Sequence, residues 1–255
     1  MSGSIKIKSA REIELMRRAG AVTAGARDIA RQMVVPGTKT RDIDRAVHDY
    51  IVKAGAKPSF LGYNGFPASA CISVNDEVIH GIPGSRVIHE GDIVSVDVGA
   101  FLGGYHGDCA GSYIAGRGTS EAEQLVEVTR QSFFEGLKQA VAGNRLSDIA
   151  RAVQSYCEER GYSIVRDYVG HGVGSELHEK PELPNFVEGI KDNVRLIPGM
   201  TLALEPMVNA GGVQIRVLRN GWTVVTRDGS LSAHYENTIL ITNGEPEILT
   251  ASEVL

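Results

Sequence analysis

The sequence has few cysteines and no long apolar run. Its three cysteines, Cys71, Cys109 and Cys157, are an odd number without a CxxC pair, which argues against a disulfide framework or a zinc ribbon. No stretch approaches the roughly 20 apolar residues of a membrane-spanning helix, and the first residues lack the apolar core of a signal peptide. These absences favour a soluble protein with reduced thiols, which we expect in the cytoplasm and not at a membrane.

An excess of basic residues is also absent. The chain carries 26 Lys and Arg against 31 Asp and Glu, a formal net charge of -5, and its pI is near 5.8. This balance gives no electrostatic reason to expect nucleic acid or an anionic membrane as a partner. With 255 residues, of which 42% are hydrophobic and 22% charged, we predict one globular unit over residues 1–255.

A diverged internal duplication is the clearest pattern in the chain. Residues 37–50 reappear at 143–156, and seven identical positions keep one constant offset of 106 residues. Both copies have the apolar spacing of an amphipathic helix, and Gly55 and Gly161 are predicted to end these helices. The two halves of the chain are therefore expected to share one fold.

The segments around these helices extend the similarity between the halves. A helical pattern precedes each copy, and each begins with a possible capping box: Ser9 with Glu12, and Ser120 with Glu123. Runs of β-branched residues between glycine turns then predict strands at 71–74, 93–101 and 105–114, and at 201–208, 213–218, 222–226 and 231–241. We predict an α+β fold of pseudo-symmetric halves, about 9–118 and 119–250, with a central antiparallel sheet in one domain.

Polar residues recur in the same order in both halves, which folding alone does not require. The matched segments are His80–Pro83 with His178–Pro181, Gly91–Asp97 with Gly199–Glu205, and His106–Asp108 with His234–Glu236. Each half thus supplies histidine and two carboxylates.

Two of these acids are predicted to lie on one face of a hairpin. Valines alternate along one face of strand 93–101, so Asp97 projects from the other face. If Gly103-Gly104 forms a two-residue turn, Gly99 lies opposite Asp108, and the two aspartates are diagonal neighbours about 7 to 8 Å apart. Because burial and mutual repulsion oppose ionisation of both carboxylates, we expect a bound cation between them.

The whole polar set indicates a dinuclear metal centre. Carboxylates and imidazoles suit Mn, Fe(II), Co or Zn, and two divalent ions about 3.5 to 4 Å apart would activate a shared water for hydrolysis. Each acid taken alone would more often be a solvated strand-end charge, and a lone loop histidine is seldom a ligand. Recurrence in register is what favours the metal site.

Six short strings resemble the type I methionine aminopeptidases, metallopeptidases of the pita-bread fold. They are HGIP at 80–83, VDVGA at 96–100, GYHGD at 104–108, GHGVG at 170–174, LEPM at 204–207 and HYENT at 234–238. The resemblance covers roughly residues 9–245. It implies a cytoplasmic, monomeric hydrolase that removes the N-terminal methionine from nascent proteins and peptides, with a preference for a small second residue. Contact with the ribosome is left open as a hypothesis.

The resemblance also assigns roles residue by residue. It places the metal ligands on Asp97, Asp108, His171, Glu205 and Glu236, with Glu205 also the general base. It places the catalytic histidines on His80 and His178, at the scissile amide and its carbonyl oxygen. It maps the methionine pocket onto Phe60, Tyr63, Phe66, Cys71, Leu177 and Trp222, for each of which ordinary packing is the alternative. Phe60 and Leu177 stand where relatives are expected to carry Cys and Phe, so the shape of the pocket and the role of Cys71 stay open.

Three other classes of protein are weighed against this one. Proline-directed relatives on the same fold usually carry an additional N-terminal domain, whereas the first helix here is expected by about residue 9. A type II methionine enzyme would need a long helical insertion, but only 34 residues separate His171 from Glu205. A non-catalytic binding module should have lost ligands, and this chain keeps all five.

Overall fold

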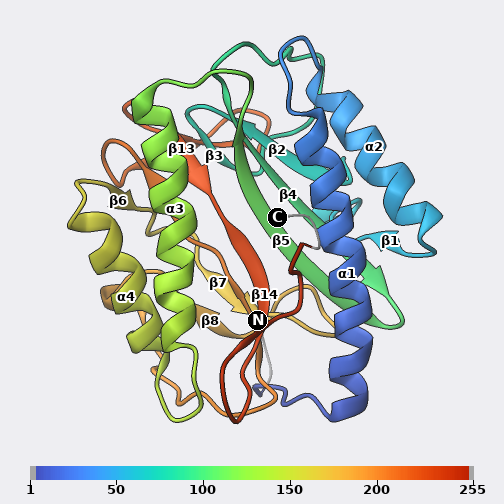
Figure 1. Ribbon diagram of the computed structural model, residues 1–255, viewed down its shortest axis with the longest axis vertical. Coiled ribbons are helices and arrows are strands. Elements are labelled where there is room, and N and C mark those ends of the chain that lie inside the picture. Colours follow the sequence, from blue (N-terminus) through green and yellow to red (C-terminus); the bar gives the residue numbers. More distant parts are fainter. Residues whose placement is uncertain (1–3, 253–255) are drawn as a thin grey trace.

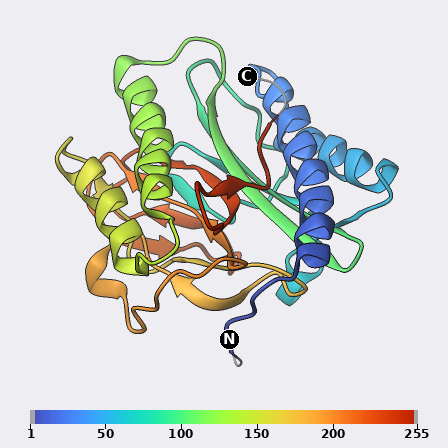
Figure 2. The same ribbon diagram turned by 60° about the horizontal axis from the view of Figure 1, so that its bottom comes forward.

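A computed structural model describes residues 4–252, so the outermost residues of the predicted 1–255 unit lie outside the described part. Within it, the α-helices form two pairs: α1 (Ala10–Met33) with α2 (Thr40–Lys53), and α3 (Ser120–Gln139) with α4 (Leu146–Glu158). Figure 1 shows one pair over each half of a central sheet, and Figure 2 shows the strands passing between the two pairs. No helix in the described residues has the length and apolarity needed to cross a membrane.

The central sheet is antiparallel throughout and joins both halves. Its order is β1-β4-β5-β14-β9-β7-β8, with β2 also on β4 and β15 also on β14. The bounds are β1 (Lys57–Pro58), β2 (Ala70–Val74), β4 (Ile93–Leu102), β5 (Tyr105–Ile114), β7 (Gly170–Gly172), β8 (Glu179–Leu183), β9 (Thr201–Leu204), β14 (Glu236–Leu240) and β15 (Glu247–Ile248). The first half meets the second where β5 pairs with β14.

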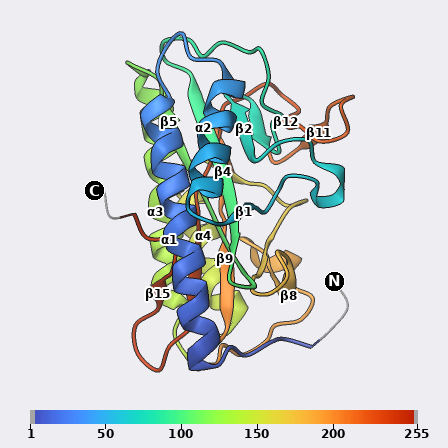
Figure 3. The same ribbon diagram turned by 90° about the vertical axis from the view of Figure 1, so that its right-hand side faces the viewer.

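Two small antiparallel sheets complete the fold: one packs against α3 and α4, and the other lies on the side away from the helices (Figure 3). One has the order β13-β10-β6 and the other β11-β12-β3. Their bounds are β13 (Ser232–His234), β10 (Met207–Asn209), β6 (Ser163–Ile164), β11 (Ile215–Val217), β12 (Val224–Thr226) and β3 (Glu77–Ile79). Short 3-10 turns lie at Tyr63–Gly65 and Val187–Gly189.

The two predicted capping boxes have different outcomes. At α1 the box is confirmed, because the Ser9 hydroxyl accepts from the Glu12 amide and the Glu12 carboxylate accepts from the Ser9 amide. At α3 the prediction of Ser120 with Glu123 is wrong by one residue. The extended Thr119 is the N-cap, and its hydroxyl accepts from the Ala122 amide. Thr is also a favoured N-cap residue, and it precedes Ser120 in the chain.

The predicted long second-half strands are interrupted at two places. Strand 201–208 divides into β9 and β10 around Glu205, because Pro206 has no amide hydrogen for a ladder bond. Strand 231–241 divides into β13 and β14 at Tyr235. Each break moves the chain between the central sheet and a small sheet. Two acids of the polar set, Glu205 and Glu236, lie directly at these breaks.

The predicted hairpin of the first half is confirmed. Leu102 pairs with Tyr105, and Gly99 pairs with Asp108. The turn residues Gly103 and Gly104 have φ of 63° and 92°, as a two-residue hairpin turn of this type needs. Asp97 and Asp108 therefore share a face of the sheet.

Candidate metal centre and substrate cavity

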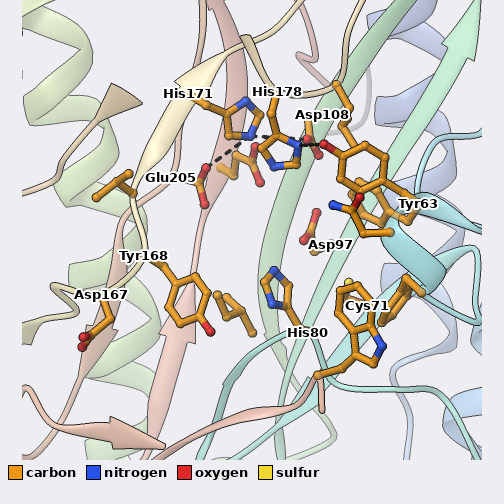
Figure 4. A pocket seen from close by; sticks show the side chains of 18 residues that line it. Tyr63, Cys71, His80, Asp97, Asp108, Asp167, Tyr168, His171, His178 and Glu205 are labelled. Carbon is orange, nitrogen blue, oxygen red and sulfur yellow. Dashed lines mark hydrogen bonds and ion pairs between the residues drawn. The ribbon is translucent and has the colours of Figure 1, made fainter. Parts of the chain in front are cut away.

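Five polar side chains from both halves converge on the face of the sheet that the helices do not cover (Figure 4). Asp97 and Asp108 come from β4 and β5, Glu236 begins β14, His171 lies in β7 and Glu205 follows β9. All five line one cavity of about 350 Å³. The arrangement brings together the residues that the sequence assigned to the metals.

His171 is oriented toward the acids by its own backbone. Its Nδ1 lies 2.9 Å from the carbonyl oxygen of Gly172, so Nδ1–H donates there and Nε2 keeps a free lone pair. That Nε2 lies 3.5 Å from Glu205 Oε1 and 3.9 Å from Asp108 Oδ2. A neutral imidazole in this tautomer is suited to hold a metal ion.

Burial changes the protonation of the whole cluster. It raises the pKa of Asp97 to about 7, and burial followed by the charge of neighbouring acids raises the pKa of Asp108 and Glu236 well above the usual range. Burial, then the charge of Asp97, does the same to the pKa of Glu205. The imidazole changes in the opposite direction, since burial lowers the pKa of His171 to about 3.

Unpartnered oxygen atoms show that these residues fit a cation. Asp97 Oδ1, Asp108 Oδ1 and Glu236 Oε1 are buried and have no hydrogen-bond partner among the described residues. Buried carboxylate oxygens without partners are costly. Potential ligand atoms form two groups, Asp97 with His234 and Glu236, and Asp108 with His171 and Glu236, each within 4.8 Å. Carboxylate and imidazole donors gathered in this way suit a divalent metal ion.

One residue of this cluster was missing from the site predicted by sequence. His234 ends β13, and its Nε2 lies 3.7 Å from Glu236 Oε2 and 3.9 Å from Glu205 Oε2. This Nε2 is also buried and unpartnered among the described residues. The signal was present in the repeat of His106 and His234, but the structure separates these two. His106 instead bonds to Ser59, with 2.8 Å between Nδ1 and Oγ.

His80 lies across the cavity in a strained backbone conformation. Its φ is 57°, in the left-handed region that residues other than glycine seldom adopt. The next residue is Gly81, where a Cβ would lie 2.1 Å from the carbonyl oxygen of Ile72. The His80 ring packs edge-on against Tyr168, and burial lowers its pKa to about 4. The chain therefore presents a neutral imidazole to the cavity.

His178 stands on the opposite side of the cavity, just before β8. Its Nδ1 lies 2.8 Å from the hydroxyl of Tyr63, whose ring stacks on it with 5.2 Å between centroids. Burial lowers the pKa of His178. If the Tyr63 hydroxyl donates to Nδ1, then Nε2 carries the proton and can donate to a substrate.

Apolar side chains form the remaining wall of the same cavity. All six residues that the sequence assigned to the methionine pocket are among the residues that line the cavity: Phe60, Tyr63, Phe66, Cys71, Leu177 and Trp222. Phe66 and Trp222 meet edge to face at 5.2 Å, and burial keeps the pKa of the Cys71 thiol well above its usual value. Lining residues that the sequence did not single out are Ile79, Asp167, Tyr168 and Val169. An apolar recess thus opens directly onto the polar cluster.

Known proteins resemble this chain over almost its whole length. The model of metallopeptidase family M24 matches residues 14–243. The methionine aminopeptidase of Clostridium acetobutylicum is 52% identical over 250 residues, which cover 98% of this chain and 100% of that protein. Methionine aminopeptidase 1 of Bacillus subtilis is 49% identical, over 95% of this chain and 98% of that one. A crystal structure of methionine aminopeptidase from Thermotoga maritima has a TM-score of 0.94 at 46% identity, covering 98% of this chain and 100% of that chain.

Proposed function

The chain belongs to metallopeptidase family M24 as one of its type I methionine aminopeptidases. We propose that it removes N-terminal methionine by means of two divalent ions, with the methionine side chain held in the adjoining apolar recess. The observation that carries this proposal is the single cavity that holds both the five acid and imidazole ligands and the six recess residues. Identity of 42% to 52% with methionine aminopeptidases supports the same activity.

The proposed ligands divide between the halves. Asp97, Asp108 and Glu236 would hold one ion, while Asp108 and Glu236 would bridge to a second, completed by His171 and Glu205. The two ligand groups support part of this division, since one joins Asp97 to Glu236 and the other joins Asp108 and His171 to Glu236. When bound, the ions supply Lewis-acid polarisation and an activated water. Mn, Fe(II), Co and Zn all suit these donors, so availability would select the metal.

Three side chains are proposed to handle protons and charge at the scissile bond. Glu205 is 13% exposed at the cavity wall, and burial followed by the charge of Asp97 raises its pKa, which makes its carboxylate more basic and suits it to act as a general base. His178, with Nδ1 occupied by Tyr63, can donate from Nε2 to the carbonyl oxygen as charge develops there. His80, with a pKa of about 4, stays neutral and can contact the scissile amide.

The recess is proposed to bind the methionine side chain. Phe60 and Leu177 are buried on its wall, beside Cys71, and this apolar lining suits a flexible thioether. A free substrate amine would then lie near the acid cluster, because the recess opens beside it. This placement explains why cleavage would remove one residue only. A small second residue is the preference we expect.

The proposed setting is the cytoplasm, where the chain acts as a monomer on methionyl peptides and nascent chains. Three buried and unpaired thiols support a reducing compartment. Contact with the ribosome would be tested by cosedimentation.

The proposal is tested with chelator-treated protein and Met-Ala-Ser as substrate. Free methionine should appear only after Mn(II) or Co(II) is added, and His80→Ala and Asp108→Asn should both abolish it. The two variants differ in one respect: Asp108→Asn should also lose metal binding, whereas His80→Ala should keep it. An Ala-Pro peptide tests for a proline-directed relative. A folded protein that releases no methionine with Mn(II), Co(II), Fe(II) or Zn(II), each added in turn, would overturn the proposed activity.

A further inference from the structure

A second cavity, of about 460 Å³, lies on the opposite side of the sheet from the metal centre. It opens between α1 and α3, where Figure 1 shows β5 and β14 behind the two helices. Strand β14 separates the two cavities, because Glu236 lines the first while its neighbours Tyr235 and Asn237 line the second. His234 lines this cavity and also faces the metal centre, and the proposed peptidase activity assigns no role to the other lining residues.

Three arginines line this cavity: Arg27 and Arg31 from α1, and Arg130 from α3. Asp28 is the single acid among the lining residues, and its Oδ2 accepts from the Ser252 hydroxyl at 2.6 Å. Arg130 is paired with Glu127 at 2.8 Å, whereas Arg27 and Arg31 form no ion pair within residues 4–252. The lining therefore carries an excess of positive charge in a chain whose net charge is negative.

Arg27 is the most unusual of the three, because it is only 6% exposed. Its guanidinium donates to two neutral acceptors, Asn237 Oδ1 at 2.9 Å and the carbonyl oxygen of Thr250 at 3.2 Å. A guanidinium has five donors in a planar fork that fits oxyanions. A buried cation without an anion is unfavourable, so a bound anion would stabilise this arrangement.

The other two guanidiniums are held in place by aromatic rings. Arg31 lies over the ring of Tyr113 at 5.9 Å, and Arg130 lies over the ring of Phe134 at 5.3 Å. Contacts of this kind between a guanidinium and a ring face fix the cation at low cost in conformational freedom. Both rings also line the cavity. The arginines are thus arranged before any ligand arrives.

We propose that this cavity binds a small molecule that carries a phosphate group. The three guanidiniums would hold the phosphate oxygens by charge-assisted hydrogen bonds. The cavity has room for more than a bare anion, since its volume falls in the range of small-molecule sites. Tyr113, Phe134 and Tyr235 supply apolar surface for the rest of such a molecule.

Calorimetric titration of the metal-loaded protein tests the proposal, with three probes at constant ionic strength: inorganic phosphate, AMP and adenosine. Phosphate and AMP should bind with one-to-one stoichiometry at this site, and adenosine should bind much more weakly. Arg31→Gln and Arg130→Gln should each weaken AMP binding by about ten-fold. Both should release methionine at the normal rate, which also shows that they fold.

Arg18→Gln is the matched control, because Arg18 is an exposed residue of the same helix α1 and the substitution removes the same charge. It should leave AMP binding unchanged. AMP affinity that is equal in the wild-type protein, Arg31→Gln and Arg130→Gln would overturn the proposal, since binding would then not depend on the arginines of this cavity. Absence of binding at millimolar AMP would overturn it as well. Both outcomes are separable from the peptidase assay, which does not involve these arginines.

Discussion

At the scale of single residues, the protein shows how far a repeated pattern can predict a site. His106 and His234 occupy equivalent places in the duplicated sequence, yet they lie in different surroundings. The first bonds to Ser59, whereas the second faces Glu205 and Glu236. Only the second is therefore in a position to support the metal centre.

Replacing His234 should weaken metal binding. His234→Gln removes a buried imidazole whose Nε2 lies 3.7 Å from Glu236 Oε2, and we expect a loss of about 10-fold to 100-fold in Mn(II) affinity. Calorimetric titration of the chelator-treated protein measures it. His106→Gln is the matched control and should bind Mn(II) normally. Equal affinities in the two variants would show that His234 only fills space.

Removing the Tyr63 hydroxyl should affect turnover more than substrate binding. Tyr63→Phe deletes the 2.8 Å hydrogen bond to His178 Nδ1 but keeps the stacked ring. Loss of one such bond corresponds to about 1 kcal/mol, or roughly five-fold in kcat. The KM for Met-Ala-Ser should change little. Steady-state kinetics would contradict the orienting role if KM rose while kcat stayed constant, and Tyr162→Phe serves as a control outside the cavity.

The metal centre should depend on pH in a defined direction. In the metal-free protein the pKa of Asp97 is raised to about 7, so the folded state holds protons that the unfolded state has released. Proton binding by Asp97 therefore stabilises the folded state. This stabilisation is complete below the ordinary carboxyl pKa and is lost as pH rises through about 7. Metal ions must displace those protons, so they bind more tightly at higher pH.

Thermal unfolding measures this prediction directly. The gain in unfolding temperature on addition of Mn(II) should be larger at about pH 8 than at about pH 5.5. Asp108→Asn, which removes a ligand shared by the proposed ions, should show little gain at either pH. The same gain at both pH values in the unaltered protein would mean that the acids are already ionised without metal.

Sequence predicted the chemical identity of the site better than its geometry. The five ligands and six recess residues do line one cavity. The internal repeat marked the four carboxylates, and the family resemblance supplied His171 and the recess residues. Three features depend on distant parts of the chain: the strained φ of His80, the bond between Tyr63 and His178, and the second cavity with its arginines. Local patterns carry no information on contacts of this range.

At the scale of elements, the predicted pita-bread α+β fold is confirmed, and the differences lie at strand ends. Periodicity located β4 and β5 to within a residue. It joined β9 to β10 and β13 to β14. Pro206 is a local signal for the first break, whereas the break at Tyr235 arises where the chain passes from a small sheet to the central sheet, which is a tertiary effect.

The segment before α1 is tied to the strand that follows His178. Lys8 and Glu179 form an ion pair at 2.6 Å, and both side chains are 3% exposed. Lys6 also reaches Glu179, at 3.0 Å, but its side chain is 49% exposed. Because Glu179 follows His178 directly and accepts from the Glu176 amide, this pair holds the loop that carries the histidine.

Breaking the buried ion pair should destabilise the protein and lower its rate of catalysis. Lys8→Met should cost about 3 kcal/mol, since it removes one partner of a buried pair, and kcat should fall because His178 loses support. Lys6→Met is the matched control and should cost at most about 1 kcal/mol, as exposed pairs do. Urea unfolding and kinetics measure both variants. Similar losses in the two would contradict a special role for the buried pair.

At the scale of the whole molecule, two cores meet at one seam. Ile43 of α2 lies in the core of the first half and Ile149 of α4 in that of the second. Between them, β5 pairs with β14, and the Thr238 hydroxyl bonds to both the amide and the carbonyl of Asp108. The candidate ligands come from both sides of this seam. We therefore propose that the predicted halves, about 9–118 and 119–250, unfold together as one catalytic domain.

Matched cavity variants test this cooperativity. Ile43→Val and Ile149→Val each remove one methylene from a fully buried side chain, at an expected cost of about 1 kcal/mol. The single tryptophan, Trp222, lies in the second half but packs against Phe66 of the first, so its fluorescence reports on the contact between the halves, while far-ultraviolet circular dichroism reports on all helices. In the metal-loaded protein both signals should give one midpoint in urea, and Ile43→Val should shift the tryptophan transition as far as Ile149→Val does. A tryptophan transition that responds to only one of the two variants would mean that the halves unfold separately, and the seam would then be an interface between two domains.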